Sequence, residues 1–145
     1  MIARRYALDT NLYIDALRSS DGALALDSFL RANAPAIYLS GIVAQELIAG
    51  ARPQDVADVE DEFVDVVARR GRVFVPSFAA WTEAGRAIAR LVGKAEWKSL
   101  PRSFINDVLL AMSCREAGVI LVTSNLRDFE RIAKVRKFDF IPPWP

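Results

Sequence analysis

The chain has 145 residues, a net charge of +1, one cysteine and no histidine. This length is typical of one domain, so we expect residues 1–145 to form a single domain. The lack of histidine excludes Ser-His-Asp and Cys-His nucleophiles and HExxH metal sites, and a single cysteine excludes an internal disulfide and a cysteine-based zinc site. Any hydrolytic chemistry must therefore use carboxylates, a metal ion, lysine or tyrosine.

The composition also bears on the cellular compartment. A single cysteine fits a reducing cytoplasm, where we expect the protein to work. The first residues, MIARRYALD, lack the apolar run of a signal peptide, and no apolar stretch approaches the length of a membrane span. We therefore expect no membrane association.

Strands and helices are predicted to alternate along the chain. Short apolar runs predict strands over residues 4–8, 36–40, 72–76, 119–123 and 138–142. Helical periodicity, with glycine as a stop signal, predicts helices over residues 11–18, 22–32, 41–50, 54–70, 79–97, 103–117 and 125–134. The helix over 54–70 is expected to have an apolar stripe made of Val56, Val59, Phe63, Val66 and Val67. The strands are almost wholly apolar, as buried parallel strands are, so the pattern predicts an α/β fold with helices on both faces of a parallel sheet.

Polar residues follow the predicted strands where each one ends. Asp9 ends the first strand, Ser40 ends the second, and Thr123 and Asn125 follow the fourth. Sites in parallel sheets form outside the carboxyl ends of the strands, at the switch point in strand order. The sequence therefore predicts a polar site at this edge.

Three acids lie on segments that otherwise read as buried. Asp9 is either the cap of the following helix or a ligand, and Glu46, in GIVAQELIAG, shares a helix face with Ile42 and Val43 and has no base within four residues on that helix. Glu46 is thus either functional or paired with a distant arginine. Asp107 comes near the first turn of a helix that is apolar nearly all round, where the helix dipole favours an anion.

A single site would account for all three acids if the fold brings their side chains together. Gathered carboxylates repel, and a bound cation relieves that repulsion. Oxygen ligands suit Mg²⁺ or Mn²⁺, and such a site positions water and stabilises charge on a phosphoryl oxygen. Asn125 and Asp128, in TSNLRDF, are placed to complete the ring.

Four segments, in order, resemble the PIN-domain family and most closely its VapC-type toxins. They are LDTNLYID, SGIVAQELIAG, NDVLLAMSCREAG and VILVTSNLRDF, and together they extend over essentially the whole chain. The resemblance implies a PIN-like three-layer α/β/α sandwich with a five-stranded parallel sheet. It also implies a Mg²⁺- or Mn²⁺-dependent endoribonuclease, the toxin of a toxin–antitoxin pair.

The resemblance also implies roles for particular residues. Three residues match the family's metal-binding acids: Asp9, Glu46 and Asp107. Asn125 stands where the family commonly has Asp, so it brings an amide oxygen without a charge, which leaves one or two metals open. Asp128 either compensates for this or caps the last helix, and Thr123 matches a position that hydrogen-bonds the acids.

The partners implied are an RNA substrate, a cognate VapB-type antitoxin and a second copy of the chain. Residues of the first two helices are candidates to line an antitoxin groove or to pack in the core: Tyr13, Leu17, Leu24, Phe29 and Leu30. Five basic residues are weak candidates for contacts with RNA: Lys94, Lys98, Arg102, Arg127 and Arg131. Trp81 and Trp97, both expected on the helix over 79–97, are better explained by packing or dimer contacts than by base stacking.

Three other functions fit the sequence less well. A haloacid-dehalogenase-like phosphatase needs Asp-x-Asp after the first strand, where this chain has Asn11, and a receiver domain needs an Asp at the end of the third strand, where RVFVPS has none. A catalytically inactive PIN-like module that only binds RNA or protein stays open as the alternative.

Overall fold

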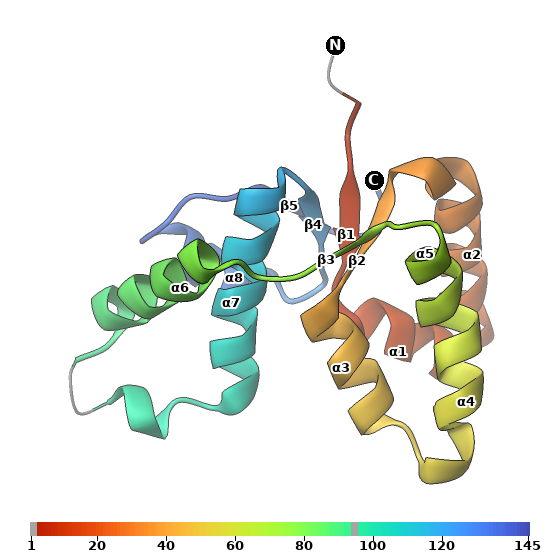
Figure 1. The fold of residues 1–145 in the computed structure, drawn as a ribbon, viewed down its shortest axis with the longest axis horizontal. Helices are drawn as coiled ribbons and strands as arrows, with labels where there is room; N and C mark the ends of the chain where they lie inside the picture. Colours follow the sequence, from red (N-terminus) through yellow and green to blue (C-terminus); the bar gives the residue numbers. More distant parts are fainter. Residues whose placement is uncertain (1–2, 94–95) are drawn as a thin grey trace.

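The fold is built around a sheet of five parallel strands. The computed structural model describes residues 3–93 and 96–145. The strands lie in the order β3-β2-β1-β4-β5 (Figure 1). Their bounds are β1 (Tyr6–Leu8), β2 (Ile37–Ser40), β3 (Val73–Phe74), β4 (Ile120–Val122) and β5 (Phe140–Ile141). All five predicted strands are present, and each is shorter than predicted.

Helices connect the strands. The α-helices are α1 (Thr10–Arg18), α2 (Ser20–Asn33), α3 (Gly41–Gly50), α4 (Val56–Val59), α5 (Val66–Arg69), α6 (Phe78–Leu91), α7 (Arg102–Ala117) and α8 (Leu126–Ala133). The short helical turns are η1 (Ala34–Ala36), η2 (Pro53–Asp55), the π-helical η3 (Glu60–Asp65) and η4 (Trp97–Ser99). None of the helices in the described ranges is long and apolar enough to cross a lipid bilayer.

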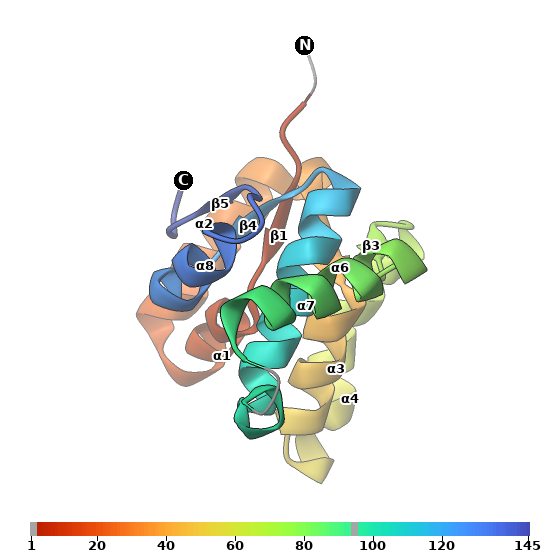
Figure 2. The same ribbon diagram turned by 90° about the vertical axis from the view of Figure 1, so that its left-hand side faces the viewer.

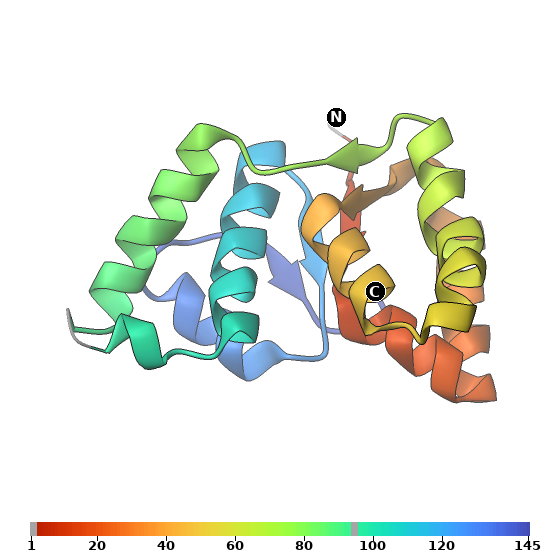
Figure 3. The same cartoon turned by 60° about the horizontal axis from the view of Figure 1, so that its bottom comes forward.

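The helices form a layer on each face of the sheet. Helices α6, α7 and α8 lie on one side and α2, α4 and α5 on the other (Figures 1 and 3). Figure 2 shows α6 and α7 side by side, on the side away from α4. The chain runs outward from β1 to β2 and β3, and then crosses to β4 on the other side of β1. This arrangement confirms the predicted α/β/α sandwich, and its switch point lies between β1 and β4.

Capping residues define where several helices begin and end. Backbone N–H groups donate to the side chains of the N-cap residues of α1, α2, α3 and α6, which are Asp9, Ser19, Ser40 and Ser77. Helix α7 ends at Gly118, which has φ +67° and ψ +33°. That left-handed conformation favours glycine, and it explains why the glycine stop predicted this end correctly.

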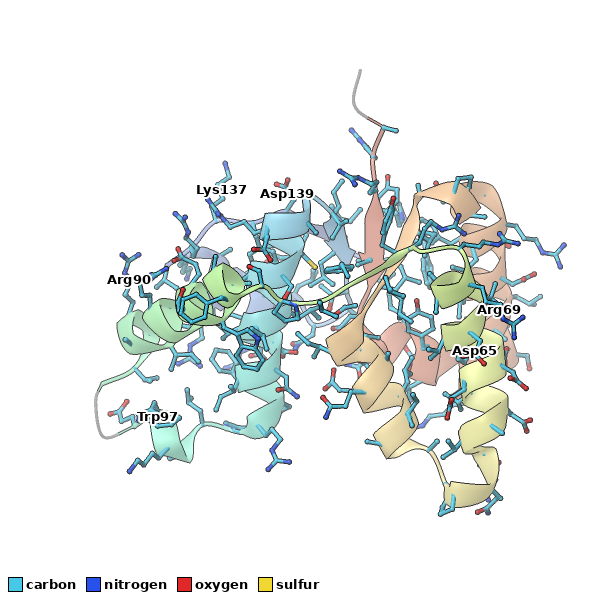
Figure 4. All side chains as sticks on the ribbon, viewed as in Figure 1. Asp65, Arg69, Arg90, Trp97, Lys137 and Asp139 are labelled. Atoms are coloured by element: carbon cyan, nitrogen blue, oxygen red, sulfur yellow. The ribbon has the colours of Figure 1, made fainter. Side chains whose placement is uncertain are left out.

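One predicted helix, over 79–97, extends too far. Helix α6 ends at Leu91, because Val92 takes an extended conformation with φ −139° and ψ 156° and is followed by Gly93. Valine and glycine are both weak helix formers, so the pair ends the helix. Trp97 therefore lies on η4 and not on the helix with Trp81. Figure 4 shows it on the side of α6 and α7, far from the sheet.

The predicted helix over 54–70 is present but winds unevenly. Its middle part, η3, is a π-helical turn, which holds more residues per turn than an α-helix. The apolar stripe expected from regular periodicity is shifted as a result: Phe63 is buried against the Tyr13 ring, whereas Val66 is exposed. The inclusion of Val66 in that stripe was wrong for this reason.

The core lies between the central strands and α7. Residues of β1, β4 and α7 are almost fully buried, including Ala7, Leu8, Leu121, Val122, Val108 and Leu110. Helix α7 has eight buried residues, which confirms that it is apolar nearly all round. On the outer side of β4 and β5, Phe129 of α8 packs against Phe138 and Phe140.

The glycine cap of α7 leads to a stability prediction with an internal control. We expect Gly118→Ala to lower the free energy of unfolding by about 1–2 kcal/mol, because alanine is strained at positive φ. Gly85, inside α6, has no atom within 4 Å of the position of an added Cβ. Gly85→Ala should therefore raise the free energy of unfolding by up to about 1 kcal/mol. Urea unfolding followed by circular dichroism measures both, and equal effects of the two substitutions would contradict this account.

Candidate active site

The candidate site lies at the carboxyl edge of the sheet, at the switch point between β1 and β4. Leu8 pairs with Val122, and the N–H of Asp9 donates to the carbonyl of Val122 at 2.9 Å. The pairing of the two strands therefore continues to the first residue beyond β1. It brings Asp9 and Thr123 together, although they are far apart in the sequence.

Asp9 is buried and held by two hydrogen bonds. Its Oδ1 accepts from the backbone N–H of Thr10 at 2.8 Å, and its Oδ2 accepts from the hydroxyl of Thr123 at 2.7 Å. The first bond caps α1, and the second confirms the predicted contact of Thr123 with the acids. Only 4% of the residue is exposed. Among the described residues, no ion pair involves Asp9.

Glu46, on α3, is linked to Asp9 through Thr10. The Thr10 hydroxyl donates to Glu46 Oε1 at 2.9 Å, while the Thr10 N–H donates to Asp9. Thr10 was not predicted as part of the site. Its position directly after Asp9 in LDTN was the available signal, but a bond to a residue 36 positions away cannot be read from the sequence. The distant arginine considered as a partner for Glu46 is absent from the ion pairs of the described residues.

Asp107 reaches the site from α7, and Asn125 joins it to the others. The Asn125 amide donates to Asp107 Oδ2 at 3.3 Å and to Asp128 Oδ2 at 3.2 Å, and its backbone N–H donates to the hydroxyl of Thr123 at 2.9 Å. Asp107 is the sixth residue of α7, which begins at Arg102. It therefore lies in the second turn, next to the first, where the effect of the helix dipole is already smaller than at the first turn.

All six predicted site residues thus lie in one chain of hydrogen bonds. It runs from Glu46 through Thr10, Asp9, Thr123 and Asn125 to Asp107 and Asp128. Asp128 belongs to the first turn of α8, and its Oδ2 accepts a hydrogen bond from the side-chain amide of the N-cap residue Asn125.

The surroundings of the site raise the pKa of all three acids. Burial, followed by the charges of Asp9, Glu46 and Asp128, raises the pKa of Asp107 from 3.8 to about 8. Burial also raises the pKa of Asp9, and the hydrogen bonds from Thr123 and Thr10 oppose this shift. The pKa of Glu46 is raised by burial and by Asp9, against hydrogen bonds from Thr10 and Asn106.

The donor set suits a hard cation, although it is not assembled as a finished cage. No three acidic, histidine or cysteine side chains within residues 3–93 and 96–145 meet at metal-binding spacing. However, Asp107 Oδ1 accepts no hydrogen bond from the described residues, and the charges of Asp9, Glu46 and Asp128 all act on Asp107. Carboxylate and amide oxygens are the ligands of Mg²⁺ and Mn²⁺, so the chemistry of the set fits such an ion.

A groove runs from Glu46 away from the sheet. It has a volume of about 620 Å³ and lies between α1, α3 and the helix that begins at α4. Its walls are partly apolar, with Ile14, Leu17, Leu47 and Val59, and partly charged, with Arg18, Arg52, Asp58 and Glu62. Of the residues predicted to line a groove on the first two helices, only Leu17 does so.

The other residues of that prediction lie elsewhere. Tyr13 and Phe29 are buried, as the core-packing alternative had it, and Leu30 is partly buried. Leu24 is exposed on α2. Trp81 and Trp97 are 59% and 48% exposed, so packing within the chain does not account for them.

The basic candidates divide into two groups. Arg127 and Arg131 lie on α8 in one hollow with Asn125 and Asp128, directly beside the site. Lys98 and Arg102 are exposed near the start of α7. Lys94 lies outside the described residues.

Known proteins resemble this chain over nearly its full length. The profile of the PIN domain matches residues 6–135. Ribonuclease VapC2 of Haemophilus influenzae is 27% identical over 139 residues, covering 94% of this chain and 98% of that protein. Ribonuclease VapC19 of Mycobacterium tuberculosis is 30% identical over 125 residues, covering 84% and 90%. The tRNA(fMet)-specific endonuclease VapC of Shigella flexneri is 26% identical over 136 residues, covering 94% and 98%.

Solved structures share the fold. A chain of DNA-bound VapBC from Salmonella typhimurium matches with a TM-score of 0.70 at 24% identity, covering 97% of this chain and 98% of that one. A chain of VapBC2 from Rickettsia felis, bound to a DNA fragment from its promoter, matches with a TM-score of 0.63 at 22% identity, covering 97% and 98%.

The profile match alone extends over most of the chain, from β1 to the residues after α8. The chain therefore belongs to the PIN-domain family, where its relatives include the VapC ribonucleases.

Proposed function

We propose that this protein is an endoribonuclease that hydrolyses RNA phosphodiester bonds with the aid of Mg²⁺ or Mn²⁺, and that it is the toxin of a VapBC-type toxin–antitoxin pair. One observation carries the proposal. Asp9, Glu46 and Asp107 gather at the switch point within a hydrogen-bonded chain that contains only neutral donors. The names of its VapC relatives support the nuclease activity.

Asp9 and Asp107 would hold the metal ion most directly, with Glu46 as the third acid. When bound, such an ion activates a water molecule and stabilises charge on the phosphoryl oxygens. Thr10 and Thr123 orient the Asp9 carboxylate, because each of its oxygens accepts one of their hydrogen bonds. Asn125 orients Asp107 and Asp128 through its amide. Since Asn125 adds no charge, the residues support one tightly bound ion better than two.

The groove beside Glu46 is the surface we assign to a cognate VapB-type antitoxin. Several structural neighbours are chains of VapBC assemblies, some of them bound to DNA. The groove offers apolar side chains flanked by arginines and acids, which suits an amphipathic segment with charges of both signs. A segment bound there would reach Glu46 and so would cover the site.

An exposed apolar patch supports a homodimer. It consists of Val75, Phe78 and Trp81, which are 69%, 84% and 59% exposed. Phe78 and Trp81 are three residues apart on α6 and share a face. Contiguous exposed apolar side chains of this size are typical of an interface.

The alternative function is a PIN-like module that binds RNA or protein without cleaving it. The two differ in what the acids do. In an inactive module, the three acids would have no role that requires a charge, yet they lie together at a place where burial raises the pKa of each one. We therefore favour the enzyme.

RNA cleavage tests the function directly. With structured RNA and Mg²⁺ or Mn²⁺, the wild-type protein should cut, and a chelator should stop the reaction. Asp9→Asn, Glu46→Gln and Asp107→Asn should each reduce the rate by more than the roughly 10- to 100-fold that follows the loss of a residue that merely supports a metal ligand. Asp139→Asn, an exposed acid just before β5 at the opposite edge of the sheet, is the control (Figure 4). Full activity of Asp9→Asn would contradict the assignment, and an inactive wild type would favour the binding module.

The raised pKa of Asp107 predicts how stability depends on pH. The folded protein holds a proton on Asp107 up to about pH 8, whereas the unfolded chain releases it near 3.8. This group therefore stabilises the metal-free fold at low pH, and that contribution is lost as the pH rises toward 8 and above. In chelator, we expect the melting temperature of the wild type to fall more steeply between pH 5 and 9 than that of Asp107→Asn.

Added Mn²⁺ completes this test. It should raise the melting temperature of the wild type above pH 8 by more than that of Asp107→Asn, because only the wild type offers the full set of charges. Parallel pH profiles of the two proteins in chelator would show that Asp107 does not carry the expected proton.

The dimer is tested by substitution of its proposed contact. Phe78→Asp should convert a dimer to a monomer in sedimentation equilibrium, because it buries a charge in an apolar interface. Leu24→Asp is the matched control, since Leu24 is 67% exposed on α2, away from the patch. A wild-type protein that is monomeric at tens of micromolar, or a dimer unchanged by Phe78→Asp, would contradict the proposed interface.

A further inference from the structure

An open hollow runs along α8 from the candidate site. It has a volume of about 640 Å³, and its lining consists of Asn125, Arg127, Asp128, Glu130, Arg131 and Lys134. One end of it belongs to the site itself, because Asn125 and Asp128 are hydrogen-bonded to each other and Asn125 also to Asp107. The hollow therefore leads out of the acidic centre.

Three bases follow one another along this hollow. Arg127 and Arg131 are four residues apart on α8, and Lys134, its C-cap residue, follows three residues later in a helical conformation, so the three side chains share one face. The eight residues of α8 extend over about 12 Å at 1.5 Å per residue. We call these three residues the α8 basic face. The opposite face of the helix is buried through Phe129 and Ile132, which fixes the direction in which the bases point.

The charges of the α8 basic face are available to a ligand. All three side chains are exposed, and none of the four ion pairs found in residues 3–93 and 96–145 includes them. The guanidinium of Arg131 lies 4.9 Å from the centroid of the Phe104 ring. This cation–π contact orients the side chain and leaves its charge uncompensated, with its N–H groups still able to bind an anion.

Such a face answers an electrostatic difficulty of the site. A polyanion that approaches Asp9, Glu46 and Asp107 is repelled by carboxylates, and one bound cation offsets only part of their charge. Bases at a fixed place beside the acids attract the neighbouring parts of the same strand. The acid nearest to them, Asp128, is already bonded to the Asn125 amide.

We propose that the α8 basic face binds backbone phosphates of the RNA substrate. These phosphates belong to the same strand as the phosphodiester bond that is cleaved and lie next to that bond. This inference deepens the proposed function and rests on it. The contacts are to phosphate, so they position the strand along α8 without reading its sequence. RNA is favoured over a protein segment because the hollow is lined by charged and amide side chains, whereas the groove beside Glu46 has apolar walls.

The test measures RNA binding without cleavage. Fluorescence anisotropy of a labelled single-stranded RNA is measured at a series of salt concentrations. Every protein compared carries Asp9→Asn, which prevents cleavage, and the protein with this substitution alone is the background protein. Arg127→Gln/Lys134→Gln is compared with Arg69→Gln/Lys137→Gln, which removes the same charge. Arg69 lies on α5, and Lys137 precedes β5 at the amino edge of the sheet (Figure 4).

At low salt, the α8 double variant should bind the labelled RNA at least about tenfold more weakly than the background protein does. Its plot of log K against log salt should be less steep by about 1.4, since each phosphate contact on a single strand contributes about 0.7. The Arg69/Lys137 variant should match the background protein. Equal binding by the two double variants would overturn the inference.

Cleavage kinetics separate this inference from the proposed function. In the protein with Asp9 intact, Arg127→Gln/Lys134→Gln should raise KM and leave kcat nearly unchanged, because these residues position the strand and do not touch the reacting atoms. A fall in kcat alone would overturn that role. A wild type that cleaves no RNA, together with weaker binding by the α8 double variant, would refute the nuclease while keeping the RNA-binding face.

Discussion

The site depends on one electrostatic constraint, which is that one buried and two partly buried carboxylates lie together, and no ion pair found in residues 3–93 and 96–145 includes them. In the described part of the chain, the hydrogen bonds to these acids come from neutral donors: the N–H and hydroxyl of Thr10, the hydroxyl of Thr123, and the amides of Asn125 and Asn106. Neutral donors orient carboxylates but do not cancel their charge. The arrangement therefore leaves negative charge uncompensated at the carboxyl edge of the sheet and raises the pKa of all three acids.

The fold supplies the rigidity that this constraint requires. Asp9 and Thr123 follow the two central strands, whose pairing is buried on both faces, and Asp107 comes from the most deeply buried helix. The acids consequently sit on elements that resist displacement by mutual repulsion. The peripheral features are less constrained: the groove beside Glu46, the apolar patch on α6 and the basic face of α8 all lie on the outer helices, where they are free to suit a partner.

Much of this could be predicted from the sequence, because the strands are apolar runs and the acids interrupt them. Asp9, Glu46 and Asp107 were identifiable since a lone carboxylate in an apolar segment needs an explanation. What sequence could not supply was geometry that depends on distant partners. The bridge from Thr10 to Glu46 joins two elements, the π-helical turn at Glu60–Asp65 breaks the period that placed Val66 inside, and the end of α6 at Leu91 cut short a periodic pattern that otherwise continued.

The hydrogen bond between Thr123 and Asp9 joins residues 114 positions apart, close to the two ends of the chain. Because β1 and β4 are neighbours in the sheet, Asp9 gains this partner only after residue 123 has been made. A fragment that stops before β4 keeps Asp9, Glu46 and Asp107 but lacks Thr123 and Asn125, which orient two of these acids. The acidic centre therefore takes its shape only when these two strands have paired.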